Sequence, residues 1–185
     1  MNIKKISIGF SPPQDVNVVV EIPVHGDPVK YEVCKTSGAM FVDRFLHTAM
    51  AYPTNYGFIP HTLSEDGDPV DVMVVAPHGV VVGSVLRSRP IGVLLMEDEH
   101  GPDEKILAVP HPTLNPFYNN VASYHDLPKI LLRQIEHFFA HYKDLEEGKW
   151  VKVTGWGGPE VAHAKIEEAI IRERRRKADF EGSEV

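Results

Sequence analysis

Three aspartates within six residues are the group most able to do chemistry in this chain. Asp66, Asp68 and Asp71 lie together in the segment 66–71. Carboxylates so closely spaced repel one another unless cations neutralise them. Hard divalent cations prefer oxygen ligands, and Mg²⁺ in particular is usually held by a few carboxylates together with water and substrate phosphates. The segment therefore predicts metal-assisted phosphate chemistry.

The same segment does not have the spacing of a dedicated calcium loop. An EF-hand loop has acids at its first, third and fifth positions, glycine at the sixth and glutamate at the twelfth. Counted from Asp66, the fifth residue is Val70, the sixth is Asp71 and the twelfth is Pro77. An EF-hand is therefore excluded for this segment.

A second acidic pair, Asp98 and Asp103, flanks the segment 99–102. A four-residue hairpin loop is predicted there, which would place the two carboxylates opposite each other about 5 Å apart. For an isolated pair, a solvated acidic turn would be the better interpretation. The presence of the cluster at 66–71 favours a metal site shared by both groups.

Glu21 lies in an almost continuous apolar run, and a buried carboxylate needs a partner. Lys30 and Glu32 are two residues apart on the next predicted strand and so share a face. Lys30 could neutralise either Glu21 or Glu32. From these residues alone, a structural ion pair across a hairpin is slightly favoured over a functional role.

The segments that must position these residues read mostly as strands, separated by Gly, Pro and Asp turns. The predicted strands are 17–24, 29–34, 70–76, 82–89, 91–98 and 105–109. Many short strands in one domain predict a closed or nearly closed barrel. Two helices are predicted to follow, one at 128–142 with Asp126 near its cap and one starting near Pro159. The expected fold is mainly β, of the α+β class, with two flanking helices.

The excess negative charge lies in one part of the chain. The formal net charge is −7, and the segment 64–104 holds nine acids against two arginines, which accounts for all of it. Such a segment concentrates cations and repels a polyanion, so nucleic acid binding is not expected. The basic run at 172–177 is interpreted as the solvated end of a helix, where cations suit the helix dipole.

Length and composition predict one domain over residues 1–185, with about 172–185 as a tail. The chain has 185 residues, of which 43% are apolar. Its longest apolar stretches fall short of the roughly 18 residues of a membrane span. Cys34 is the only cysteine, which excludes an internal disulfide and a thiolate zinc cluster. With no export segment, a cytoplasmic location is expected.

At this point the residues show a family resemblance. The segment 66–72 resembles the signature of the family I soluble inorganic pyrophosphatases. Further motifs resemble the bacterial branch and follow in the same order, namely 21–23 (Glu-Ile-Pro), 30–32 (Lys-Tyr-Glu), 41–44 (Phe-Val-Asp-Arg), 52–57 (Tyr-Pro-Thr-Asn-Tyr-Gly), 96–109 and 141–145 (His-Tyr-Lys-Asp-Leu). The resemblance covers about residues 15–156. Several motifs in the right order are more specific than one pattern.

The resemblance implies a five-stranded, OB-like closed barrel with helices packed outside. It implies hydrolysis of pyrophosphate to two phosphates with several Mg²⁺ ions per site, leaving Mn²⁺ and Zn²⁺ open as substitutes. Asp68 would accept the proton of the attacking water. The metal ligands implied are Asp66, Asp71, Asp98, Asp103, Glu21 and Glu32. The substrate-binding residues implied are Lys30, Arg44, Tyr52, Tyr56, Lys105, Tyr142 and Lys143, although without the family match Tyr142 would be read as a core aromatic.

The resemblance also suggests how copies of the chain assemble, and two alternative functions stay open. Related bacterial enzymes suggest a homohexamer, with contacts through the helix that carries His137 and His141. No nucleic acid and no membrane partner is expected. The alternatives are another Mg-dependent phosphohydrolase, acting on nucleoside polyphosphates or phosphodiesters, and a non-enzymatic cation-binding barrel.

Overall fold

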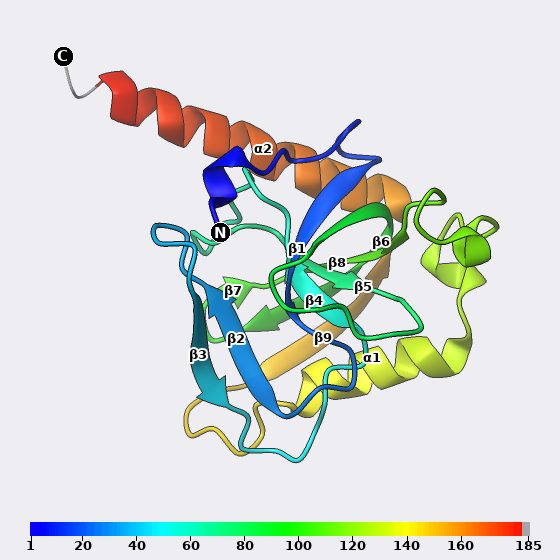
Figure 1. The fold of residues 1–185 in the computed structure, drawn as a ribbon. Coiled ribbons are helices and arrows are strands. Elements are labelled where there is room, and N and C mark those ends of the chain that lie inside the picture. The colour runs from blue at the N-terminus through cyan, green and yellow to red at the C-terminus, as the bar shows by residue number, and fades with distance from the viewer. Residues whose placement is uncertain (183–185) are drawn as a thin grey trace.

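A computed structural model describes residues 1–182, and the last three residues of the predicted tail lie outside the described part (Figure 1). The strands are β1 (Val16–Ile22), β2 (Val29–Val33), β3 (Met40–Phe45), β4 (Asn55–Phe58), β5 (Asp71–Val74), β6 (Val85–Asp98), β7 (Gly101–Pro102), β8 (Lys105–Pro110) and β9 (Val151–Gly157). The α-helices are α1 (Lys129–His141) and α2 (Pro159–Gly182), and short 3₁₀ helices span Ile3–Lys5, Pro116–Tyr118 and Tyr124–Asp126. The prediction of a mainly β fold with two helices is confirmed.

Seven strands form one sheet in the order β1-β4-β5-β8-β6-β7, and β9 pairs with β6. Strand β6 also pairs with β1, so the path through β1, β4, β5, β8 and β6 returns to its first strand. All pairs are antiparallel except β5 with β8, which run parallel. Strands β2 and β3 form a separate hairpin, which stands beside the main sheet in Figure 1.

The long strand β6 differs from the prediction of two strands at 82–89 and 91–98. Pro90 lies inside β6 and cannot donate a backbone hydrogen bond. On one side of β6, the pairing with β1 ends at Ser88 and the pairing with β9 begins at Val93. Pro90 therefore falls between two partners on that side, and on the other side it pairs with Ala108 of β8 just before the register shifts.

Strands β3, β4, β7 and β9 were not predicted as strands. Strand β4 is only four residues long and contains Gly57, which weakens the sequence signal for a strand. A Cβ atom on Gly57 would lie 1.9 Å from the carbonyl oxygen of Val19 on β1. Only glycine allows β1 and β4 to approach so closely.

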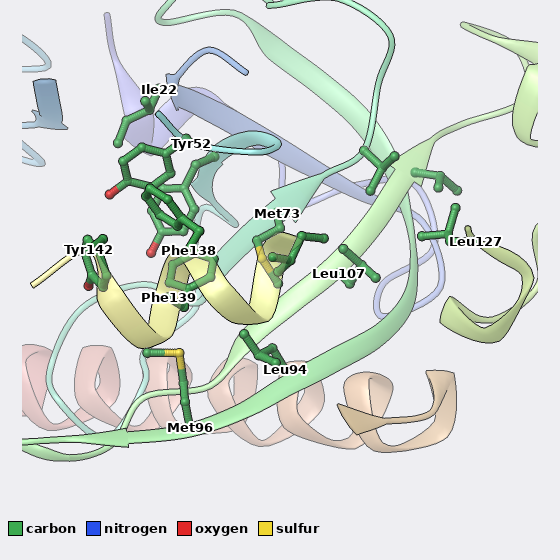
Figure 2. Packing of buried hydrophobic residues seen from close by; sticks show 14 of the residues in the cluster. Ile22, Tyr52, Met73, Leu94, Met96, Leu107, Leu127, Phe138, Phe139 and Tyr142 are labelled. Atoms are coloured by element: carbon green, nitrogen blue, oxygen red, sulfur yellow. The ribbon is translucent and has the colours of Figure 1, made fainter. Parts of the chain in front are cut away.

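Helix α1 lies across the main core. Its buried residues Ile135, Phe138 and Phe139 pack with Tyr52 and Tyr142 (Figure 2). Figure 2 shows these tyrosines at one end of the cluster and Leu127 at the other. The cluster also contains Met73, Leu94, Met96 and Leu107 from the sheet. Helix α1 therefore joins the core to the place where Tyr52 and Tyr142 lie.

Asp126 lies near the N-cap of α1, as predicted, but it does not cap that helix. The N-cap residue of α1 is Pro128, and it makes no side-chain cap hydrogen bond. Asp126 instead belongs to the short 3₁₀ helix before α1, where it forms a capping box with Ser123. Its carboxylate accepts from the backbone N–H of Ala122 and of Ser123, both at 2.9 Å.

Helix α2 covers a second core cluster. Ala162, Ile166 and Ala169 are buried with Val72 of β5 and Ile106 of β8. The helix continues to Gly182, so residues 172–182 of the predicted tail are helical. Over the described residues, neither α1 nor α2 has the length and apolar character needed to cross a bilayer.

Candidate active site

A cavity of about 600 Å³ lies where the loop before β5, the β6–β7 turn, the β2–β3 hairpin and the end of α1 meet. All fourteen residues that the sequence analysis assigned to the site line this cavity. They are Glu21, Lys30, Glu32, Arg44, Tyr52, Tyr56, Asp66, Asp68, Asp71, Asp98, Asp103, Lys105, Tyr142 and Lys143. Residues from distant parts of the chain therefore meet at one place, although their individual roles remain predictions.

Lys105 lies between two of the aspartates. The parallel pairing of Val72 with Ile106 puts Asp71 and Lys105 side by side at the starts of β5 and β8. The Nζ of Lys105 donates to Asp71 Oδ2 at 2.5 Å and also to Asp103 Oδ1. Burial opposes the charge of Lys105, but Asp71 and Asp103 outweigh it and raise the pKa of Lys105 well above its usual value. Lys105 is therefore a permanent cation within the acidic cluster.

Lys143 makes a second buried ion pair with Asp98. Lys143 follows the last turn of α1, and its Nζ donates to Asp98 Oδ2 at 2.7 Å. Burial tends to raise the pKa of Asp98, but the bonds from Lys143 and from the backbone N–H of His100 lower it below its usual value. The end of α1 is thereby attached to the end of β6.

The turn after β6 is tighter than predicted. Asp98 pairs with Gly101, so the loop contains two residues instead of four. The backbone N–H of Asp103 donates to the carbonyl of Met96 at 2.9 Å, which shows that Asp103 lies opposite Met96. The prediction that Asp98 and Asp103 lie directly opposite each other is wrong. Because Met96 and Asp98 are two residues apart, the two aspartates still share a face, as diagonal neighbours.

Glu21 is the extra residue of a β-bulge. Val20 pairs with Gly57 and Ile22 pairs with Tyr56, which leaves Glu21 without an opposite residue on β4. Its Oε1 accepts from the backbone N–H of Val33 at 2.8 Å. Burial raises the pKa of Glu21 from 4.5 to about 7, against the opposing effects of the Val33 bond and of Lys35. The expectation of a buried acid at this position is confirmed, since the residue is 5% exposed.

The predicted pairing of Lys30 with Glu21 or Glu32 is wrong. Lys30 forms its ion pair with Asp43 on the neighbouring strand β3, at 3.1 Å. Asp43 is itself the extra residue of a bulge, because Lys30 pairs with Arg44 and Tyr31 pairs with Val42. The cation nearest Glu21 is Lys35, at 3.6 Å. Lys35 was missed because it lies in the turn after β2, outside the strand alternation that the prediction used.

Arg44 forms an ion pair, without a hydrogen bond, with a carboxylate that was not predicted. The Nε of Arg44 lies 3.1 Å from Oε1 of the buried Glu146, and the other oxygen of Glu146 lies 2.9 Å from Lys149. Burial tends to raise the pKa of Glu146, but the bond from Lys149 and the charge of Arg44 lower it. Glu146 follows α1 among other charged residues, and its sequence gave no signal that this one is buried.

The loop that carries Asp66 and Asp68 is closed by its own hydrogen bonds. The backbone N–H of Ser64 donates to the carbonyl of Asp68 at 2.7 Å, and the N–H of Asp68 donates to Asp66 Oδ1 at 3.0 Å. Gly67 has a φ of +93°, which favours glycine. Asp66 is exposed, and the partial burial of its carboxyl raises its pKa above the usual value. Asp68 is exposed at the rim of the cavity.

Three tyrosines line the cavity from the core side. Burial raises the pKa of Tyr52, Tyr56 and Tyr142 above the usual tyrosine value, so their hydroxyls stay protonated at neutral pH. The ring of Tyr142 stacks on Phe138 with 5.2 Å between centroids. Tyr142 is therefore both a core aromatic and a lining residue, and the two interpretations of it are compatible.

The donor groups fit hard divalent cations. They are carboxylate oxygens. Burial is the main cause that raises the pKa of Glu21, Asp66 and Asp103, and nearby carboxylates such as Asp71 raise it further. Within residues 1–182 no three acidic, histidine or cysteine side chains form a ready-made metal cage. Mg²⁺ does not require one, because waters and substrate phosphates commonly complete its coordination.

Comparison with known proteins assigns the family. A model of the family described as inorganic pyrophosphatase matches residues 18–174. The chain belongs to this family. It is similar to the inorganic pyrophosphatases of Rhodospirillum rubrum, at 67% identity, and of Bradyrhizobium diazoefficiens, at 60% identity. Each match spans 96% of this chain and 99% of the relative.

Solved structures of bacterial pyrophosphatases have the same fold. The enzyme from Thermus thermophilus matches with a TM-score of 0.89 at 40% identity, covering 94% of this chain and 99% of that one. The enzyme from Coxiella burnetii matches with a TM-score of 0.87 at 47% identity, covering 90% and 99%. The resemblance to the bacterial family I pyrophosphatases is thus confirmed along almost the whole chain.

Proposed function

We infer that this chain hydrolyses inorganic pyrophosphate to two orthophosphates. Family membership supports this activity and disfavours both the other phosphohydrolases and a non-enzymatic cation-binding barrel. The observation that carries the inference is the composition of the cavity. A set of carboxylates suited to cations faces cationic and tyrosine side chains suited to phosphates, within about 600 Å³.

In this proposal the phosphate oxygens are bound by four cationic side chains, Arg44, Lys30, Lys143 and Lys105. A guanidinium can bind two oxygens at once, whereas each lysine acts as a point charge. Lys143 and Lys105 are aimed at the cavity by their buried ion pairs with Asp98 and Asp71. The buried tyrosines at the cavity wall, Tyr52, Tyr56 and Tyr142, add neutral hydroxyl donors.

Mg²⁺ is the proposed cofactor, with several ions per site and with Mn²⁺ and Zn²⁺ as candidates for substitution. The proposed ligands are Asp66, Asp71, Asp98, Asp103, Glu21 and Glu32. Bound divalent ions would neutralise the phosphate charge and lower the pKa of a water near the phosphorus. Lys105 and Lys143 already offset part of the carboxylate charge, so they limit the repulsion among these acids before metal binds.

Asp68 is the proposed proton acceptor. It lies between the proposed ligands Asp66 and Asp71 in sequence, at the rim of the cavity. The water oxygen forms a bond to one phosphorus, the bridging P–O bond breaks, and the second phosphate leaves with the electron pair of that bond. The water proton passes to a carboxylate oxygen of Asp68.

We further propose the architecture and assembly that the family resemblance implies. The ring of β1, β4, β5, β8 and β6 would be a closed, OB-like barrel, within a single domain over residues 1–185. Copies would form a cytoplasmic homohexamer through α1. On that helix His137 and His141 have ring centroids 4.7 Å apart, and His141 lies 2.8 Å from Asp144.

A phosphate-release assay tests the activity. Purified protein is given pyrophosphate with Mg²⁺, with a chelator, and with Mg²⁺ and fluoride, and ATP is offered in parallel. Release that requires Mg²⁺ and is much faster from pyrophosphate than from ATP supports the proposal. Negligible release from pyrophosphate with rapid cleavage of ATP would instead support the alternative phosphohydrolase.

A further inference from the structure

Helix α2 is hydrogen-bonded to both backbone groups of Leu63, at the start of the acidic loop before β5. The N–H of Leu63 donates to the carbonyl of Ala169 at 3.1 Å, and Arg172 Nη1 donates to the carbonyl of Leu63 at 2.6 Å. Arg172 also lies 3.7 Å from Glu65, an exposed residue for which the contact is weak. Backbone groups in a loop need hydrogen-bond partners. Helix α2 supplies a partner for both the N–H and the carbonyl of Leu63, three residues before Asp66.

The same face of α2 also holds the second acidic segment. Lys165 lies two helical turns before Arg172, so the two side chains leave the helix on the same side. The Nζ of Lys165 lies 2.6 Å from Oε1 of Glu104. Glu104 stands between Asp103 and Lys105, whose side chains face the cavity. Because side chains alternate in an extended segment, Glu104 points to α2 while its neighbours point to the site.

The apolar contacts of α2 reach the same two strands. Ile166 and Ala169 belong to the same buried cluster as Val72 and Ile106, which directly follow Asp71 and Lys105. The side chains of β5 and β8 therefore alternate between the cluster that contains the α2 residues and the face that carries Asp71 and Lys105. A displacement of α2 would move both acidic segments together.

We propose that Arg172 and Lys165 are positioning residues that fix the two acidic segments from behind and so set the metal affinity of the site. The inference rests on the proposed function, because it concerns the proposed metal ligands. Neither side chain lines the cavity, so their effect passes through the backbone of Leu63 and through Glu104. Arg172, the first residue of the basic run 172–177, would then have a positioning role in addition to solvating the end of the helix.

The test is Mg²⁺ binding to the free protein, measured by calorimetry without substrate. Arg172→Ala is expected to weaken Mg²⁺ binding about tenfold, because residues that orient metal ligands typically change affinity by about 10- to 100-fold. Arg172→Lys keeps one charged donor and should recover part of the loss. Arg175→Ala removes the same charge from an exposed position of the same helix and should bind Mg²⁺ as the parent does. Lys165→Ala should act in the same direction as Arg172→Ala.

Turnover and thermal unfolding separate positioning from general stability. The Mg²⁺ concentration for half-maximal activity should rise about tenfold in Arg172→Ala, while kcat at saturating Mg²⁺ stays within about twofold. A lower melting temperature with parental Mg²⁺ affinity would overturn the proposal. If Arg172→Ala does not fold, parental affinity in Arg172→Lys and in Lys165→Ala overturns it. If Mg²⁺ binding shifts as expected but the parent does not cleave pyrophosphate, the positioning role of Arg172 and Lys165 is supported and the proposed function is wrong.

Discussion

The stability of the metal-free protein should fall as the pH rises through the range in which Glu21 ionises. Burial raises the pKa of Glu21 from 4.5 to about 7, and the residue is only 5% exposed. In the unfolded chain the carboxyl returns to its ordinary pKa. Between these two values the folded protein binds more protons than the unfolded chain, so its stability decreases with pH. The contribution is fully present below the unfolded pKa and is lost as pH passes the folded pKa.

Glu21→Gln isolates this contribution. The amide keeps an oxygen that can accept from the backbone N–H of Val33, but it cannot ionise. At 1.36 kcal/mol per pKa unit, a rise from 4.5 to about 7 corresponds to about 3 kcal/mol. The variant and the parent should have similar unfolding free energies near pH 4. Near pH 8 the variant should be more stable by about 3 kcal/mol.

Urea denaturation in the presence of a chelator, at several pH values between these limits, measures the difference. Glu147→Gln, at an exposed position, serves as the matched control and should show a nearly constant difference from the parent. A constant difference for Glu21→Gln across the same range would refute the reasoning, because it would mean that burial does not disfavour the ionised carboxylate. Saturating Mg²⁺ should reduce the advantage of Glu21→Gln near pH 8, since cation binding favours the ionised form.

Three further predictions concern turnover and assembly. Asp68→Asn should lower kcat by at least about 100-fold in steady-state assays, since general-base catalysis contributes about 10²- to 10⁴-fold. Mg²⁺ binding and KM should stay within about twofold of the parent values. An unchanged kcat would show that Asp68 is not the proton acceptor. Arg44→Lys should raise KM for pyrophosphate about tenfold, because one charge-assisted hydrogen bond of about 1.5 kcal/mol is lost. A parental KM would show that Arg44 does not bind two phosphate oxygens at once. Light scattering should give a mass of about six chains of 20.7 kDa, and a single 20.7 kDa species at working concentration would contradict the hexamer.

The fourteen residues predicted for the site all line one cavity, and the sequence indicated them partly by residue type and partly by the family motifs. Closely spaced carboxylates such as Asp66 and Asp71 need cations in any fold, and the order of several motifs was specific to one family. The long apolar strands and the amphipathic helix α1 were also predictable, since burial imposes their periodicity. Strand β4 was not, because four residues that include Gly57 carry little periodic signal.

What could not be predicted is which cation faces which acid. Strict alternation puts Lys30 and Glu32 on one face and gives Lys30 a choice of two acidic partners. A bulge adds one residue to a single strand and reverses the alternation beyond it. Asp43 is such a residue, and it takes Lys30 as its partner.

Glu21 occupies the corresponding position in β1, and this explains how a strand buried along its whole length presents a carboxylate to the cavity. The burial of every residue from Val16 to Ile22 left no face of the strand for a charged group. The bulge turns Glu21 away from its regular neighbours, and the backbone N–H of Val33 then satisfies one of its oxygens. Bulges thus occur at Glu21, which lines the cavity, and at Asp43, which pairs with the lining residue Lys30. Their positions depend on pairing between distant strands, which a single strand's pattern does not contain.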